Sequence, residues 1–305
     1  MPTTATGKTA ASQQPAYRGR FAPSPSGPLH FGSLLAALGS YLDARAHGGA
    51  WLVRIEDIDP PREMPGADSL ILRQLETFGL HWDEEVLYQS ARLPAYEAKL
   101  EQMRQEGAAY HCACTRKRVK SIGGHYDNHC RALDLPAEGS AVRFAHRRPI
   151  PSFADLRLGR VELEPPWDQE DFVVRRRDGL VAYQLAVVMD DIEQGITHVV
   201  RGIDLLETTG WQLALYRHWR QAPPAHLHLP LALDANGHKL SKQNHAPALN
   251  TDEPQAELSR ALTGLKLKPP AELAGAPAPE LLAWAVPRWS RTALGQEREL
   301  AWQGA

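Results

Sequence analysis

Long apolar runs, cysteines and excess charge are all scarce in this 305-residue sequence. No apolar run approaches the roughly eighteen residues of a transmembrane helix, so no membrane span is expected. There are three cysteines, which argues against a disulfide scaffold and favours a reducing cytoplasm. The formal net charge is −2, so bulk charge does not indicate a nucleic-acid-binding protein. The hydrophobic fraction of 43% is typical of a globular chain, long enough for two domains or one domain with an insertion.

Residues 1–16 lack the apolar core of a signal peptide. They consist mainly of Thr, Ala, Gln, Ser and Pro, a composition that predicts a disordered tail. They also contain no acidic residue, which leaves a transit peptide as an alternative.

The segment 17–109 has the pattern strand, loop, helix, strand, helix. Leu34, Leu35, Leu38 and Leu42 recur at helical spacing behind a Gly/Pro-rich turn. Residues 51–55 predict a strand that ends in acidic residues. Alternation of this kind predicts an α/β fold with a parallel, doubly wound sheet of the Rossmann type.

The character of the sequence changes over 110–171, which contain all three cysteines, Gly123-Gly124 and several prolines. We interpret this segment as an insertion that is stabilised by something other than a large core. The α/β pattern resumes over 172–247. Strands are predicted at 181–189, 198–200 and 228–233, a helix at 209–219, and a turn at Asn236-Gly237. Residues 248–305 predict two or three short helices.

A Pro/Gly-rich loop joins the first predicted strand to its helix, with the sequence Arg20-Phe21-Ala22-Pro23-Ser24-Pro25-Ser26-Gly27-Pro28-Leu29-His30-Phe31-Gly32-Ser33. A helix that begins after such a loop presents unpaired N–H groups and the positive end of its dipole, which suits phosphate. Gly32 would let the adenine and ribose of a nucleotide approach the backbone. His30 would donate a hydrogen bond to a phosphate oxygen as charge develops there. The alternative is an ordinary helix N-terminus with one satisfied histidine.

A second segment, Lys239-Leu240-Ser241-Lys242-Gln243, follows about two hundred residues later, after a strand and a turn. Two lysines three positions apart can bind a triphosphate as it becomes pyrophosphate. Taken alone, such a segment is more often a solvated surface loop. The triphosphate carries more charge than these groups can neutralise, so we expect ATP to bind with Mg²⁺.

Together the two segments resemble the HIGH and KMSKS signatures of class I aminoacyl-tRNA synthetases. The sequences of residues 20–27 and 54–59 resemble those of the glutamate branch of that class, and the match runs from about residue 17 to 249. Ser33 replaces the last histidine of HIGH, at a position that varies in this branch. The resemblance implies catalytic roles for His30, Lys239 and Lys242. It implies ATP binding by Pro23, His30, Gly32, Ser33, Lys239, Ser241 and Lys242.

A pocket for glutamate needs fixed cations for a carboxylate and an anion or hydroxyls for the ammonium group. Arginine suits the first role because its planar fork matches a carboxylate. Arg20 and Arg201 are placed at the ends of predicted strands, and Glu56 and Tyr183 would face the same crevice. The alternative is a set of surface ion pairs. By resemblance, the family's glutamate contacts fall on Arg20, Phe21, Ala22, Pro23, Ser24, Glu56, Tyr183 and Arg201.

The cysteines suggest one structural zinc ion, which favours four tetrahedral ligands. Cys112, Cys114 and Cys130 would supply three of them, the alternative being three reduced, buried cysteines. Zinc chemistry alone favours a histidine as the fourth ligand, which would be His111, His125 or His129. The resembled family instead has the pattern Cys-x-Cys-x11-Tyr-x3-Cys, which implies Tyr126.

A full glutamyl-tRNA synthetase carries a large helical region after its KMSKS loop to read the anticodon, and residues 248–305 are too few for that domain. The sequence is therefore most similar to the glutamyl-queuosine tRNA(Asp) synthetase family, a truncated relative. This resemblance implies activation of L-glutamate by ATP without tRNA, then esterification of the cyclopentenediol of queuosine in the tRNA(Asp) anticodon. A cytoplasmic monomer is expected.

Three alternatives remain: a minimal glutamyl-tRNA synthetase that charges the tRNA 3′ end, a non-catalytic tRNA-binding paralogue, and another HIGH-type nucleotidyltransferase. The two lysines at 239 and 242 argue against the second alternative, and residues 54–57 argue against the third. Local basic runs could hold RNA phosphates or form a solvated face. They are Arg116, Lys117, Arg118 and Lys120; Arg147 and Arg148; and Arg175, Arg176 and Arg177.

Overall fold

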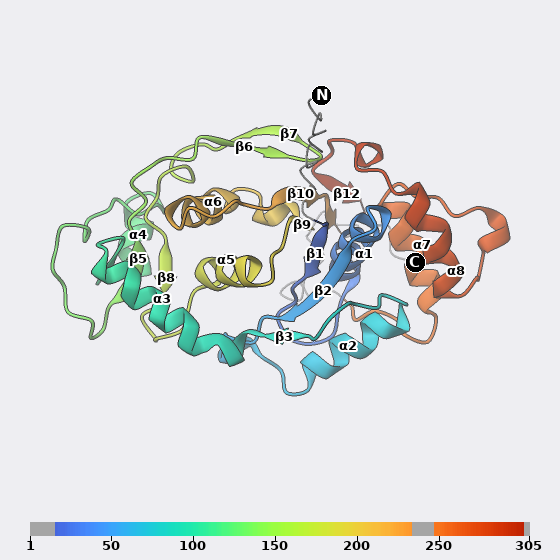
Figure 1. Cartoon of the computed structure of the whole chain (residues 1–305), viewed down its shortest axis with the longest axis horizontal. Coiled ribbons are helices and arrows are strands. Elements are labelled where there is room, and N and C mark those ends of the chain that lie inside the picture. The colour runs from blue at the N-terminus through green and yellow to red at the C-terminus, as the bar shows by residue number, and fades with distance from the viewer. Residues whose placement is uncertain (1–15, 234–246, 302–305) are drawn as a thin grey trace, which may run out of the picture.

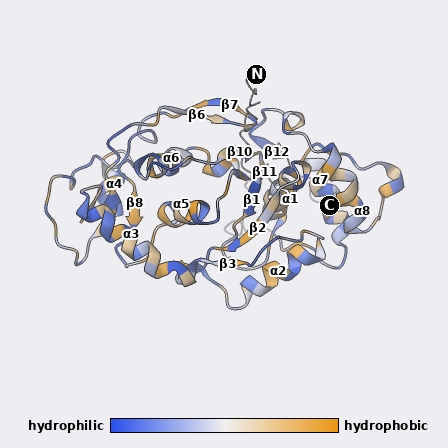
Figure 2. Cartoon of the chain, viewed as in Figure 1, coloured by the Kyte–Doolittle hydropathy of each residue, from blue (hydrophilic) through white to orange (hydrophobic). Residues whose placement is uncertain are grey.

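The computed structural model describes residues 16–233 and 247–301. In this part of the chain the molecule is elongated, with strands near its middle and helices around them (Figure 1). Helices α7 and α8 occupy one end, and α4 with a small sheet occupies the other. Figure 2 shows that helices such as α2, α3 and α8 carry both hydrophobic and hydrophilic residues, as expected for helices with one face on a core.

Parallel strands form the centre of the fold. They are β1 (Arg18–Phe21), β2 (Ala50–Ile55), β3 (Leu87–Tyr88), β9 (His198–Gly202) and β10 (Ala225–Leu229). β2 pairs with β1 and β3, and β9 pairs with β10. The amide of Thr197 donates to the carbonyl of Arg18 at 2.9 Å, so β9 adjoins β1. The strands β3-β2-β1 and β9-β10 thus lie side by side, which confirms the predicted α/β fold with parallel strands. In such folds ligands bind beyond the carboxyl ends of the strands.

The helices that accompany these strands are α1 (Phe31–Ala46), α2 (Ala67–Thr77), α3 (Leu93–Gln105), α5 (Tyr183–Glu193) and α6 (Thr209–His218). The leucines that predicted the first helix are all buried in α1. Burying each of them contributes about 1.5–3 kcal/mol. The expected strand at 51–55 and the helix at 209–219 are also present, within one residue at each end.

Two predicted strands differ from the structure. The segment 181–189 lies mainly in helix α5, not in a strand. The sequence pattern does not reveal this helix, because Leu185–Val188 are all buried and so show no amphipathic period. Periodicity alone cannot distinguish such a helix from a buried strand. The strand predicted at 228–233 is two strands, β10 and β11 (Leu231–Leu233), separated by Pro230, which has no N–H for a ladder. The turn predicted at residues 236–237 lies outside the described residues.

The middle of the chain forms a small antiparallel sheet of β4 (Ala109–Cys112), β5 (Ala141–Phe144) and β8 (Val173–Arg175), with helix α4 (Arg116–Ser121) beside it. A hairpin of β6 (Ser152–Asp155) and β7 (Gly159–Glu162) returns to the central strands, where β6 pairs with β10. The expectation that this region lacks a large core is wrong, because its apolar side chains share one buried cluster with α3, α5 and α6.

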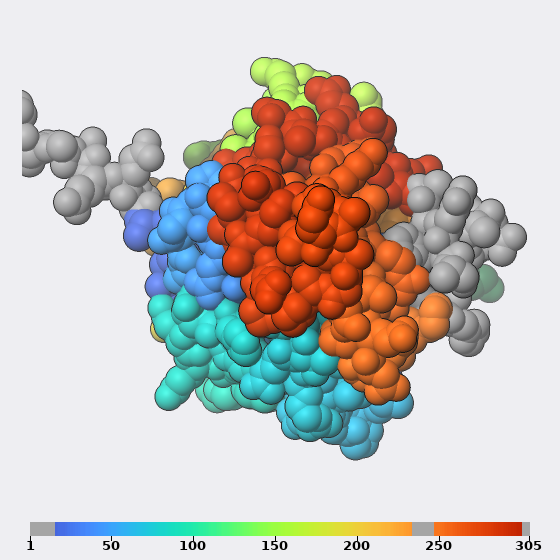
Figure 3. Space-filling model, turned by 90° about the vertical axis from the view of Figure 1, so that its right-hand side faces the viewer, coloured from blue at the N-terminus to red at the C-terminus, as the bar shows by residue number. Residues whose placement is uncertain are grey.

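The C-terminal part contains the expected short helices, α7 (Pro254–Gly264) and α8 (Ala278–Ala285), and a strand β12 (Glu299–Ala301) that pairs with β11. Leu258 and Leu262 of α7 and Leu281 of α8 are buried in the same cluster as α1. Figure 3 shows this segment, orange to red, lying against the blue and cyan N-terminal part. No helix in the described ranges is both long and apolar enough to span a bilayer.

Candidate active site

A cavity of about 500 Å³ opens where β1, β9 and β10 end. Its walls come from the loop after β1, the start of α1, the first residue of α5 and the segments that follow β9 and β10. Ten predicted site residues line it: Arg20, Phe21, Ala22, Pro23, Ser24, His30, Gly32, Ser33, Tyr183 and Arg201. Residues that are far apart in the sequence therefore meet at the carboxyl edge of the sheet, as a doubly wound fold requires.

His30 caps the N-terminus of α1. Its Nδ1 accepts a hydrogen bond from the amide of Ser33 at 3.3 Å, and its Nε2 lies 3.0 Å from the Ser33 hydroxyl. Because Nδ1 is an acceptor, a neutral ring carries its proton on Nε2, which is then a donor. The ring thus caps α1, and Nε2 lies beside the Ser33 hydroxyl at the N-terminal, positive end of the helix dipole.

The predicted lysine loop, with Lys239, Ser241 and Lys242, lies outside the described residues. Its two flanks, however, border the cavity. Ala232, just before the segment 234–246, lines the cavity wall. Just after it, Ala248 forms a bridge with His30, and the amide of Leu249 donates to the carbonyl of Leu29 at 3.0 Å.

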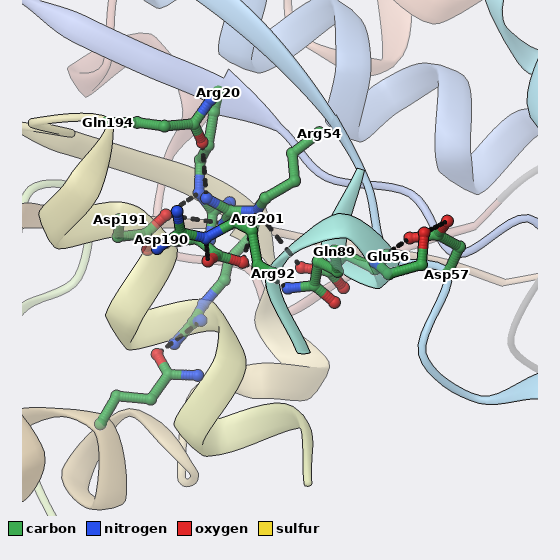
Figure 4. Close-up of polar contacts among 12 residues, drawn as sticks. Arg20, Arg54, Glu56, Asp57, Gln89, Arg92, Asp190, Asp191, Gln194 and Arg201 are labelled. Carbon is green, nitrogen blue, oxygen red and sulfur yellow. Dashed lines mark hydrogen bonds and ion pairs between the residues drawn. The ribbon is translucent and has the colours of Figure 1, made fainter. Parts of the chain in front are cut away.

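Arg20 is held in place by a buried carboxylate. Its Nε and Nη2 donate to Asp191 at 3.2 and 3.4 Å, and Nη2 of Arg54 donates to the same carboxylate at 2.7 Å. Figure 4 shows Arg20 and Arg54 both directed toward Asp191. Burial acts to raise the pKa of Asp191, but the two guanidinium groups outweigh it and hold that pKa below its ordinary value. The shared carboxylate thereby fixes Arg20 at the edge of the cavity.

Glu56 follows β2, and its amide donates to the carbonyl of Pro23 at 3.0 Å, which ties it to the cavity loop. Glu56 is buried, 7% exposed, and does not itself line the cavity. Within the described residues, its Oε1 has no hydrogen-bond partner, and the Nε of Arg54 is 3.8 Å away. Burial raises the pKa of Glu56 to about 7, despite the attraction of Arg54 and Arg20. A buried carboxyl group with an unused oxygen can accept a cation.

Arg201 is 5% exposed and is held on three sides. Its Nε donates to Nε2 of His228 at 3.1 Å, Nη1 donates to Gln212 at 2.8 Å, and Nη2 donates to the hydroxyl of Thr209 at 2.7 Å. Burial lowers the pKa of Arg201 from its ordinary value, yet an arginine stays charged at neutral pH. Tyr183 lines the same cavity, and burial raises the pKa of its hydroxyl, which therefore stays a neutral donor.

Comparison with known proteins agrees with this geometry. The family model for the catalytic domain of class I tRNA synthetases for E and Q matches residues 16–258. A glutamyl-Q tRNA(Asp) synthetase of Vibrio vulnificus is 53% identical over 93% of both chains, and one of Klebsiella pneumoniae is 55% identical over 90% of this chain and 93% of its own. The chain belongs to the glutamyl-Q tRNA(Asp) synthetase family. It is accordingly a class I aminoacyl-tRNA-synthetase-type ligase.

A solved structure supports the same assignment. The glutamate-tRNA synthetase of Elizabethkingia anophelis superposes with a TM-score of 0.77 at 25% sequence identity. The match covers 94% of this chain and 68% of that protein. The α/β fold with a parallel sheet is thus shared between this glutamyl-Q family member and a glutamate-tRNA synthetase.

The three cysteines of this family member come together at the end of β4. The sulfur atoms of Cys112, Cys114 and Cys130 all lie within 4.8 Å of one another, and the last two are 3.5 Å apart. The hydroxyl of Tyr126 lies 3.4 Å from the Cys112 sulfur and accepts from the Cys130 amide at 2.8 Å. Zn–S distances of about 2.3 Å suit sulfurs at this separation, so the donor set is compatible with one zinc ion.

The three candidate histidines are placed less favourably. His125 and His129 are exposed, and Nδ1 of His111 lies 2.9 Å from the carbonyl of Leu135. In the described ranges, only the cysteines form a group of His, Cys, Asp or Glu side chains with metal-binding spacing. Tyr126 is therefore the neighbour of the three sulfurs that the geometry favours.

The predicted basic runs divide into two kinds. Arg118 pairs with Asp127 at 2.7 Å, and Arg177 donates to the carbonyl of Ala113 at 2.6 Å, so these side chains hold the local fold. In contrast, Lys117 is an exposed residue of α4. Exposed too are Arg116, Lys120, Arg147 and Arg148.

Sequence reasoning did not find the carboxylate that holds Arg20. Asp190 and Asp191 lie in α5, directly after the segment 181–189 that the sequence predicts to be a strand. Asp190 accepts hydrogen bonds from Gln89, Arg92 and Tyr96. Figure 4 shows Gln89 and Arg92 beside Asp190, next to the carboxylate of Asp191. Two adjacent acidic residues directly after a long apolar run were the available signal.

Proposed function

We propose that this chain uses ATP to convert L-glutamate into glutamyl-adenylate without tRNA. It then transfers the glutamate to the cyclopentenediol of queuosine in the anticodon of tRNA(Asp). One observation carries the proposal: two fixed arginines and Tyr183 line a single cavity together with the start of α1, and the buried Glu56 is tied to the loop of that cavity. Relatives at 50–55% identity are named glutamyl-Q tRNA(Asp) synthetases, which supports this acceptor.

The first step needs one bond to form and one to break. A carboxylate oxygen of glutamate attacks the α-phosphorus of ATP, and the bond to the pyrophosphate leaving group breaks. Negative charge grows on the leaving phosphates, where His30 would donate from Nε2. Lys239 and Lys242 would meet the same charge, on a loop whose flanks border the cavity. Mg²⁺ bound with ATP would neutralise the remainder.

Glutamate would lie between charges of both signs. Arg20 and Arg201 are the cations that would bind its carboxylates, because each is fixed by buried partners before the ligand arrives. Glu56 would take the ammonium group, since its carboxylate has an unused oxygen and no strong ion pair within the described residues. This arrangement would favour glutamate over glutamine. Glutamine has an uncharged amide in place of the side-chain carboxylate, and an amide pairs less well than a carboxylate with an arginine.

We also propose that one structural zinc ion is bound by Cys112, Cys114, Cys130 and Tyr126. When bound, zinc would cross-link the loop after β4 to residues 126–130. The exposed basic residues nearby, Arg116 and Lys117 on α4, would then be held at fixed positions. They could bind the phosphates of one stem-loop, a contact that would weaken with salt.

The second step requires a hydroxyl about 3 Å from the mixed anhydride. Queuosine supplies a vicinal diol on its cyclopentene ring, chemically similar to the diol of a terminal ribose. One diol oxygen attacks the carbonyl carbon of the adenylate, AMP leaves, and an ester forms. An unmodified guanine has no such diol, so discrimination should be nearly absolute.

The decisive test incubates the enzyme, ATP and labelled glutamate with two RNAs. The first is an anticodon stem-loop of tRNA(Asp) that contains queuosine and has no acceptor stem. The second is full-length tRNA without queuosine. We expect label on the first and none on the second. Glutamate on the 3′ end of unmodified tRNA would overturn this proposal in favour of a minimal glutamyl-tRNA synthetase.

A separate measurement tests activation. Glutamate-dependent exchange between ATP and pyrophosphate should occur with no RNA present. Strict dependence of this exchange on tRNA would contradict the tRNA-independent first step, whatever the acceptor.

A further inference from the structure

Nε of Arg201 donates to His228, a residue that does not line the cavity. Arg201 and His228 are direct register partners on the parallel strands β9 and β10. Register partners on neighbouring strands point to the same side of a sheet, so the two side chains meet. On its other side, His228 contacts Asp155, the last residue of β6, which pairs with β10 at the neighbouring position 226.

The hydrogen bonds fix which ring nitrogen of His228 carries the proton. Asp155 Oδ2 lies 2.7 Å from Nδ1 and also accepts from the amide of His228 at 3.1 Å. Its Oδ1 accepts from the amides of Arg157 and Leu158, both at 2.9 Å. A carboxylate with these partners only accepts, so Nδ1 must be the donor.

Neutral histidine has one donor nitrogen and one acceptor nitrogen. Burial lowers the pKa of His228 to about 4, so the ring is neutral at physiological pH. Burial acts to raise the pKa of Asp155, but hydrogen bonds from His228 and two backbone amides outweigh it and keep the carboxylate ionised. With Nδ1 protonated, Nε2 has a lone pair, and this lone pair accepts from Arg201 Nε at 3.1 Å.

We propose that Asp155 and His228 are positioning residues that hold the Arg201 guanidinium in the orientation needed to bind glutamate. The inference rests on the proposed function, because it takes Arg201 as a glutamate ligand. Neither Asp155 nor His228 lines the cavity, so they act through Arg201. The arrangement also links the β6–β7 hairpin to the active site, since Arg157, in the turn between β6 and β7, donates to the carbonyl of His228 at 2.5 Å.

Asp155→Asn tests the proton assignment. An amide NH₂ group facing the ring would make Nδ1 an acceptor and place the ring proton on Nε2. Two donors, this N–H and Arg201 Nε–H, would then face each other. The amide in its other orientation would face the amides of Arg157 and Leu158 instead, which also disrupts the site. We expect the glutamate KM in pyrophosphate exchange to rise about tenfold or more, with the ATP KM changed less than about twofold.

His228 variants separate positioning from general packing. His228→Leu removes the acceptor and should raise the glutamate KM about tenfold. His228→Gln places an amide oxygen near the former Nε2 position and should restore most of the affinity. His226→Leu is the matched control: it lies two residues away on the same strand, is 3% exposed, and stacks on His228 with ring centroids 6.0 Å apart. It should leave the glutamate KM nearly unchanged.

The outcomes are distinguishable. Wild-type enzyme without glutamate-dependent exchange would overturn the proposed function and with it the role of the two residues. Wild-type exchange together with an unchanged glutamate KM in both Asp155→Asn and His228→Leu would overturn this inference alone. An equal loss in His226→Leu and His228→Leu would also overturn it, because packing rather than the hydrogen bond would be responsible. Nitrogen-15 NMR of the wild type should find His228 protonated on Nδ1, and protonation on Nε2 contradicts the assignment.

Discussion

Replacing Glu56 by glutamine should make the folded chain more stable and at the same time weaken its affinity for glutamate. The side chain is buried, one carboxylate oxygen has no hydrogen-bond partner within the described residues, and its pKa is about 7 in the folded chain, against an ordinary value of 4.5. Ionised Glu56 therefore destabilises the folded state. Glutamine keeps the size of the side chain but removes the charge.

The magnitude and the pH window follow from linkage. Between pH 4.5 and 7 the folded chain holds a proton on Glu56 that the unfolded chain has released, so the free energy of unfolding of the wild type falls as the pH rises through this window. The total loss above pH 7 is about 3 kcal/mol. The free energy of unfolding of Glu56→Gln lacks this decrease, because glutamine does not ionise. The two proteins should be about equally stable below pH 4.5, and the variant about 3 kcal/mol more stable at pH 8.

Urea unfolding between pH 4 and 8 measures the stability difference, and calorimetry at pH 8 measures glutamate affinity. We expect Glu56→Gln to weaken glutamate binding at least about tenfold, because a hydrogen bond to a charged group contributes about 1.5–3 kcal/mol. The wild type should bind glutamate more tightly as the pH rises toward 7, where Glu56 becomes ionised. Glu76→Gln, an exposed glutamate on α2, is the control and should change neither property.

Two results would refute this reasoning. A Glu56→Gln variant that is no more stable than the wild type at pH 8 would mean that the buried carboxylate is already well compensated. A variant that is more stable yet binds glutamate with unchanged affinity would mean that Glu56 does not contact the ammonium group.

Three further predictions concern other parts of the molecule. Lys242→Ala should lower the kcat of glutamate-dependent pyrophosphate exchange about a hundredfold, roughly 3 kcal/mol, with an unchanged unfolding curve; near-wild-type exchange would identify a mere surface loop. Purified protein should contain one zinc ion per chain by atomic absorption, and Cys130→Ala should lose it. Retention of zinc in Tyr126→Phe with loss in His129→Ala would disprove the tyrosine ligand. Asp191→Asn leaves two buried guanidinium groups without their shared carboxylate. It should lower the free energy of unfolding by about 3–5 kcal/mol and raise the glutamate KM, and wild-type stability in urea would argue against this role.

The sequence alone determined the parts of this protein that depend on local patterns. The loop from Arg20 to Ser33 could be recognised because a nucleotide site needs a strand, a Gly/Pro-rich turn and a helix start in immediate succession. The structure places ten of the predicted residues around one cavity. The spacing of Cys112, Cys114 and Cys130 likewise predicted a cluster that the fold brings together.

The partners that hold the cavity arginines could not be predicted from local sequence. Asp191 is 171 residues from Arg20, and Asp155 is 73 residues from His228, so no local period links either pair. The pairing of β9 with β10 and of β10 with β6 depends on strand register. Register is set by the packing of the whole sheet, because a shift of one residue would turn each side chain to the opposite face. Local sequence motifs predict the residues proposed to bind the ligand. The partners that fix their orientation come from distant segments, which meet only once the core has formed.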